Sequence, residues 1–69
     1  MKLSARNQFK GTVVAVKEGP VSAKVVVDIG GGNKITSTIT IDSFAELGIK
    51  VGSEVTTIIK SSSVMLGIE

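Results

Sequence analysis

The 69-residue chain contains no cysteine, no histidine, no tryptophan and no tyrosine. Without cysteine it forms no disulfide, and without cysteine and histidine it lacks the ligands of the usual structural zinc sites. The same absences exclude a Ser-His-Asp triad and a thiol nucleophile. The six acidic residues are scattered along the chain, as is typical of solvated faces. We therefore predict that the protein is not an enzyme, needs no cofactor and binds no bare metal cation.

Aromatic residues and net charge are also scarce. The chain has two aromatic residues, Phe9 and Phe44, and a formal net charge of +2. Proteins that bind single-stranded nucleic acid combine aromatic stacking platforms with a positively charged groove. Here both phenylalanines stand where the strand and helix patterns need core residues, and the positive charges form no stripe. We therefore predict no nucleic-acid partner.

Long apolar runs are missing as well. The longest run, residues 13–16, is far shorter than the ~20 residues that a membrane-spanning helix needs. The first residues are followed by a polar stretch, so the sequence shows no apolar region typical of a secretion signal. We expect a cytoplasmic protein without a membrane segment.

The chain is rich in valine, isoleucine and threonine, which favour strands. Its length is enough for a single domain, covering residues 1–69. A domain of this size buries only about 60% of the surface that its unfolded chain exposes, so it is marginally stable by itself. Because disulfides and zinc are excluded, we expect self-association into a homo-oligomer to supply the missing burial.

Alternating apolar and polar residues predict strands over residues 9–17, 21–29, 34–41 and 54–60. A fifth short strand is predicted near the C-terminus, where Val64, Leu66 and Ile68 alternate with other residues. Residues 30–33, three glycines and an asparagine, predict a hairpin between the second and third strands, because both residue types tolerate a positive φ.

One short helix is predicted between the third and fourth strands. Ser43 and Glu46 have the spacing of a capping box, which predicts Ser43 as the N-cap residue, and Gly48 is a typical stop. The order of elements predicts an all-β fold, a small five-stranded OB-type Greek-key barrel with one short helix between strands 3 and 4. An SH3-like barrel is the nearest alternative, and the helix favours the OB-type barrel.

Three polar stretches hold hydrogen-bond donors and cations. Their candidate ligands are Ser4, Arg6, Thr40, Ser43, Lys60 and Ser61. A guanidinium offers an oxyanion a planar fork of donors, an ammonium adds a point charge, and hydroxyls donate further bonds. Each residue also has a structural interpretation: an N-cap for Ser43, a solvated strand end for Lys60, and an ion pair with a neighbouring chain for Arg6. The coincidence of the three stretches favours an oxyanion site.

A family resemblance rests on segments distributed along the whole chain. These segments are Ser4-Ala5-Arg6-Asn7-Gln8, Lys10-Gly11, residues 19–23, residues 39–43 and residues 59–62. They resemble those of the molbindins, small single-domain molybdate-binding proteins, and Ser-Ala-Arg-Asn-Gln is the most specific of them. The resemblance implies OB-type subunits that assemble as a homohexamer, a trimer of dimers, and bind molybdate or tungstate between subunits.

The resemblance also implies how the site residues are divided. One subunit would supply Ser4 and Arg6. Its neighbour would supply the other four ligands, Thr40, Ser43, Lys60 and Ser61. A second class of site near the threefold axis has a candidate wall in Val21, Ser22 and Ala23. Because the chain has no DNA-binding domain and no ATPase motif, the implied role is storage, buffering or delivery of molybdate. A structural oligomer without an oxyanion ligand and a nucleic-acid-binding module are the alternatives.

Overall fold

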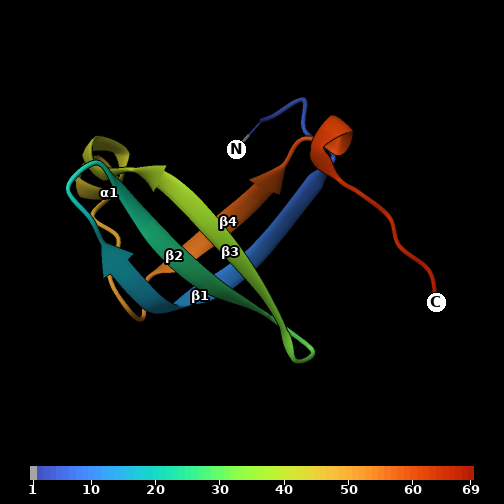
Figure 1. Cartoon of the computed structure of the whole chain (residues 1–69), viewed down its shortest axis with the longest axis horizontal. Helices are drawn as coiled ribbons and strands as arrows, with labels where there is room; N and C mark the ends of the chain where they lie inside the picture. The colour runs from blue at the N-terminus through green and yellow to red at the C-terminus, as the bar shows by residue number, and fades with distance from the viewer. Residues whose placement is uncertain (1) are drawn as a thin grey trace.

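The longest element of the computed structural model, which describes residues 2–69, is strand β1 (Asn7–Glu18). Its first half pairs with β4 (Glu54–Ile59) and its second half with β2 (Ser22–Gly30). Strand β3 (Asn33–Thr40) pairs with the other side of β2, so the antiparallel order is β3-β2-β1-β4. Because one bent strand joins both halves, the sheet curls (Figure 1). Its edge strands β3 and β4 line a common groove.

Strand β1 bends where it passes from β4 to β2. Thr12 stands at this point, since it pairs with both Glu54 and Asp28. The preceding residue, Gly11, has no side chain, and a Cβ there would lie 2.5 Å from the backbone oxygen of Asp28. Glycine therefore permits the close approach of backbones that the bend requires.

A β-bulge at Val14 corrects the faces that strict alternation predicts for β1. Alternation places Val13 and Val16 on opposite faces. In the structure the register skips Val14, because Val13 pairs with Val27 and Ala15 pairs with Val26. One extra residue reverses the alternation beyond it. Val13 is therefore buried and Val16 packs against the same core, while Val14 is exposed.

The fully buried core is small. Its members are Val13, Ala23, Val25 and Val27, and partly buried side chains from β2, β3, β4, α1 and the segment after α1 pack around it. The predicted hairpin between β2 and β3 is confirmed, since Gly30, Gly31 and Gly32 all have positive φ. Asp28 Oδ1 accepts a hydrogen bond of 2.8 Å from the Gly30 N–H and so fixes the start of this turn.

Helix α1 (Ile41–Leu47) lies between β3 and β4 as predicted, but its N-cap residue differs. Ser43 lies inside the helix, and Thr40 is the N-cap, with extended φ and ψ of −66° and 151°. The Thr40 Oγ1 accepts a hydrogen bond of 3.1 Å from the Ser43 N–H. A threonine ending β3 therefore satisfies one of the free N–H groups of the first turn. The predicted stop is confirmed at Gly48, the C-cap residue, which has a φ of 63°.

After β4 the chain forms a short 3-10 helix, η1 (Ser61–Ser63), and an extended C-terminal segment. The predicted fifth strand is wrong for the single chain: within residues 64–69 no residue belongs to a strand. The coarser prediction, a mostly β fold with one short α-helix between the third and fourth strands, is confirmed. Within residues 2–69 the structure contains no helix with the length and apolar character needed to cross a membrane.

Candidate functional site

The N-terminal segment and the end of β4 lie side by side. The β1–β4 ladder begins with the pair Asn7 and Ile59, and Asn7 Nδ2 donates a 3.2 Å hydrogen bond to the Ile59 oxygen. Arg6 and Lys60 stand immediately outside this pair, so the ladder brings the two cations to the same end of the sheet. Both are exposed, and Figure 1 shows the N-terminal segment beside η1.

Each of these two cations has a serine close to it in the chain. Ser4 precedes Arg6, and Ser61 follows Lys60 as the first residue of η1. The Ser63 N–H donates a 2.9 Å hydrogen bond to the Lys60 oxygen, which closes the η1 turn. We call the four residues Ser4, Arg6, Lys60 and Ser61 the cationic end. Residues 4–8 and 59–63 contain no carboxylate, so the cationic end combines positive charge with donors.

The other two predicted ligands lie at the N-terminus of α1. The Thr40 Oγ1 donates a 2.9 Å hydrogen bond to the Ser43 Oγ, so the two hydroxyls contact each other. Thr40 also pairs with Ser22 across the β2–β3 ladder, and the Ile41 N–H donates a 2.9 Å bond to the Val21 oxygen. The predicted second-site wall therefore adjoins this pair of hydroxyls. We call these four residues the helix end: Thr40, Ser43, Val21 and Ser22.

Ala23 does not share the exposure of its neighbours in the predicted wall. Val21 is 75% exposed, whereas Ala23 is fully buried in the core. In the single chain, the exposed part of the predicted wall therefore comes from Val21 and Ser22.

The cationic end and the helix end are far apart in one chain. The molecule is 36 Å long, and Figure 1 shows α1 at one extreme, well away from the N-terminal segment and η1. The chain thus groups Ser4 and Arg6 with Lys60 and Ser61, and it separates all four from Thr40 and Ser43. One tetrahedral oxyanion can contact both groups only when different subunits supply them.

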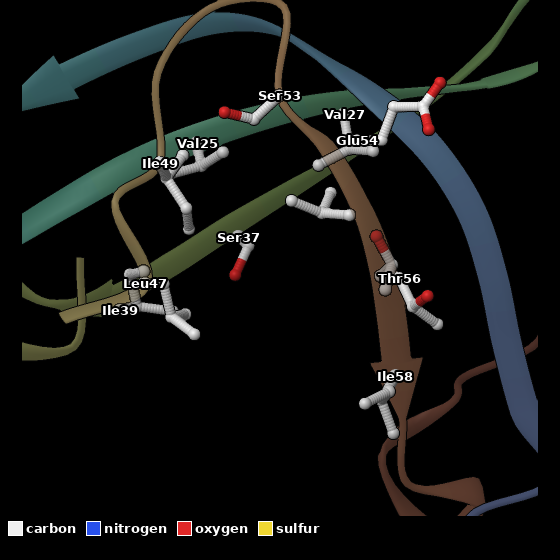
Figure 2. Close-up of a pocket in the computed structure, with 12 residues that line it drawn as sticks. Val25, Val27, Ser37, Ile39, Leu47, Ile49, Ser53, Glu54, Thr56 and Ile58 are labelled. Atoms are coloured by element: carbon white, nitrogen blue, oxygen red, sulfur yellow. The ribbon is translucent and has the colours of Figure 1, made fainter. Parts of the chain in front are cut away.

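An apolar groove lies between β3 and β4 (Figure 2). Val25 and Val27 form its floor, and Ile39, Ile49 and Ile58 are among the apolar side chains on its sides. Its one ionisable side chain is the carboxylate of Glu54, whose charge has the same sign as an oxyanion. The groove is therefore not suited to an anion. Within residues 2–69 no group of three or more acidic side chains is placed to hold a metal ion.

One functional contact was missed from the sequence. Asn7 belongs to the Ser4-Ala5-Arg6-Asn7-Gln8 segment but is not among the candidate ligands, and its side chain ties the N-terminal segment to β4 next to Arg6 and Lys60. An asparagine amide offers two N–H donors, and this one stands at the first residue of β1, opposite the last residue of β4. That position was the available signal.

The fold and the candidate site together define a small, mostly β domain with a cationic cluster of donors at one sheet end. The chain belongs to the TOBE domain family, whose model matches residues 3–66. It is 58% identical over 66 residues to molybdenum-pterin-binding protein 1 of Clostridium pasteurianum, which covers 96% of this chain and 97% of the relative. The molbindin resemblance read from the sequence is thereby confirmed.

Solved structures agree with this assignment. The chain matches MopII from Clostridium pasteurianum with a TM-score of 0.92 and 55% identity, over 97% of this chain and 100% of MopII. It matches the cytoplasmic molybdate-binding protein ModG, in a form with molybdate bound, with a TM-score of 0.95 and 43% identity. That match covers 100% of this chain and 49% of the ModG chain, so this chain corresponds to about half of ModG.

Proposed function

We propose that the protein binds the tetrahedral oxyanions molybdate and tungstate, for storage, buffering or delivery of molybdate in the cytoplasm. The observation that carries this proposal is the cationic end, where the β1–β4 ladder places Arg6 beside Lys60 without a carboxylate among the adjacent residues. The relatives support the choice of ligand, since the matched ModG structure is described as having molybdate bound. The role is binding without catalysis.

Each residue of the cationic end has a separate task in this proposal. Arg6 supplies a fork of donors that matches two oxygens of the anion, and Lys60 supplies a point charge. The hydroxyls of Ser4 and Ser61 complete the set from the same sheet end. Two positive charges match a dianion, so binding leaves little uncompensated charge.

The helix end takes part through a neighbouring subunit. Thr40 and Ser43 are too far from Lys60 in one chain to share its ligand, so we place them against the cationic end of another subunit. This requires an oligomer, and the homohexamer implied by the molbindin resemblance meets the requirement. The finer fold, a five-stranded OB-type barrel, also belongs to the assembled protein, because one chain supplies four strands.

Calorimetric titration with molybdate tests the site. Arg6→Ala and Lys60→Ala each leave part of the anion's charge unmatched, at a cost of about 2–5 kcal/mol in binding. We expect each dissociation constant to rise at least ~30-fold. Lys34→Ala is the matched control, because Lys34 is an exposed lysine at the glycine hairpin, opposite Asp28. Unchanged affinity in both site variants, with circular dichroism like the wild type, would place the ligand elsewhere.

A further inference from the structure

Two amide side chains, those of Asn7 and Gln8, stand directly after Arg6 of the cationic end. The chain has three amide side chains in all, and the third, Asn33, lies at the glycine hairpin. Asn7 is half-buried and Gln8 is exposed. Both donate hydrogen bonds to backbone oxygens within the single chain. Two of the three amides therefore serve the backbone at the edge of the proposed anion site.

The Asn7 amide acts on the peptide unit that precedes Lys60. Asn7 Nδ2 donates a 3.2 Å hydrogen bond to the Ile59 oxygen. This oxygen and the Lys60 N–H belong to one planar peptide unit, so a bond that fixes the oxygen also fixes the N–H. Strand β4 ends at Ile59, which leaves Lys60 outside the ladder. The amide therefore holds the point at which the chain leaves the sheet toward Lys60.

The Gln8 amide does the same for Arg6. Gln8 Nε2 donates a 2.8 Å hydrogen bond to the Ala5 oxygen, three residues earlier in the chain. The Ala5 oxygen and the Arg6 N–H again share one peptide unit, and the bond closes a turn that contains Arg6. Strand β1 begins at Asn7, so Arg6 has no partner in the ladder. The side-chain bond supplies the restraint that the ladder does not give to Arg6.

We propose that Asn7 and Gln8 are positioning residues that set the spacing between Arg6 and Lys60, and thereby the size of the oxyanion that the site accepts. This proposal rests on the oxyanion-binding function proposed above. Each amide holds the backbone oxygen immediately before one of the two cations. The amides are adjacent in β1, so the two restraints are joined by a single peptide bond. Loss of either bond releases one cation relative to the other.

Spacing is what can distinguish molybdate from sulfate, because the two dianions share charge and shape and differ in size. A binding site discriminates only when its donors are held within about 0.5 Å of their working positions. Arginine and lysine side chains each have about 2 kcal/mol of rotamer entropy, so on a loose backbone they would follow an anion of either size. Amides are suited to this restraint because they are uncharged. They leave the balance between two cations and one dianion unchanged.

Calorimetric titration of the full chain with molybdate and with sulfate tests the proposal. Asn7→Leu and Gln8→Met keep the approximate size and the charge of each side chain and remove the donor. We expect each to lower molybdate affinity by about fivefold to tenfold, as for one lost neutral hydrogen bond. The ratio of molybdate to sulfate affinity should fall at least ~threefold, because the lost restraint widens the range of accepted sizes. A role in folding alone would weaken both anions equally.

Asn33→Leu is the matched control, since it removes an exposed amide at the glycine hairpin. It should change neither affinity by more than ~twofold. Because Gln8 is exposed, Gln8→Met remains a valid test where Asn7→Leu fails to fold by circular dichroism. Wild-type selectivity in the amide variants, with binding lost in Arg6→Ala and Lys60→Ala, would overturn the positioning role and leave the oxyanion site standing. A wild type that binds neither anion would overturn both.

Double-mutant cycles show through which cation each amide acts. The loss caused by Asn7→Leu should shrink to less than ~twofold when Lys60→Ala is already present, because the group that it positions is gone. Gln8→Met should lose its effect in the same way in the Arg6→Ala background. It should keep most of its effect in the Lys60→Ala background, which is the crossed control. Equal losses in every background would show that the amides do not act through the cations, and the proposal would be wrong.

Discussion

Arg6 is the residue whose geometry matters most at the cationic end, because a guanidinium binds two oxygens at fixed spacing. Arg6→Lys keeps the charge and loses the fork. We expect molybdate affinity to fall about tenfold, less than in Arg6→Ala, as measured by calorimetry. Lys60→Arg tests the converse, since a point charge there is replaced by a fork. If Arg6→Lys binds like the wild type while Arg6→Ala does not, charge alone governs recognition.

The absence of a carboxylate from the cationic end predicts anion selectivity. Hydrogen phosphate near neutral pH carries a proton that needs an acceptor, and a buried donor without one costs about 1–3 kcal/mol. Sulfate carries no proton, but its shorter bonds lengthen every hydrogen bond from fixed donors. We expect molybdate and tungstate to bind equally, sulfate more weakly and phosphate most weakly. Competition calorimetry at matched ionic strength measures this order. Phosphate competing as well as sulfate would reveal an acceptor, for which Asp42 beside the helix end is the candidate.

At the scale of single elements, Thr40 and Ser43 are the two candidates for the N-cap of helix α1. The structure makes Thr40 the N-cap, so Thr40→Ala should lower the free energy of unfolding by about 1 kcal/mol. Ser43→Ala keeps the backbone N–H that donates a hydrogen bond to the Thr40 Oγ1. Its effect on the free energy of unfolding should therefore stay within about 0.5 kcal/mol. Urea denaturation without ligand measures both, and Thr40→Ser, which keeps the oxygen, is the control. A larger loss in Ser43→Ala would restore the cap that the capping-box spacing predicts.

Strands, hairpin and helix stop could be predicted because each leaves a local mark in the sequence. Alternation marks the strands, three glycines mark a turn with positive φ, and Gly48 marks the helix end. The bulge at Val14 could not be predicted, because an inserted valine looks like any other strand residue. Thr40 was missed as the N-cap because it is also the last residue of β3, and the alternating pattern assigns it to the strand.

The candidate site could be predicted as a set of chemical groups but not as an arrangement. Arg6 and Lys60 are far apart in sequence, and only the β1–β4 register shows that they share a sheet end. The resemblance implies that one subunit supplies Thr40, Ser43, Lys60 and Ser61 together, yet the curl of the sheet separates the first two from the last two within one chain. Residue types reveal which ligand is suited to a chain, whereas register and curvature decide which residues can meet.

At the scale of the whole molecule, the main feature is how little one chain buries. Four side chains form the fully buried core, and the sheet has two edges with an apolar groove between them. A domain of this size has few ways to gain stability without disulfides or metal. The proposed oxyanion site adds to this demand for association, since it is incomplete in a single chain.

Stability should therefore depend on protein concentration. Association of native chains, but not of unfolded ones, stabilises the folded state by mass action. For a domain of this length, 1 kcal/mol moves the melting temperature by about 4–8 °C. We expect the melting temperature to rise by about 5 °C or more over a 100-fold increase in concentration, as measured by differential scanning calorimetry. A melting temperature that is the same at every concentration for the wild type would show that one chain is stable alone.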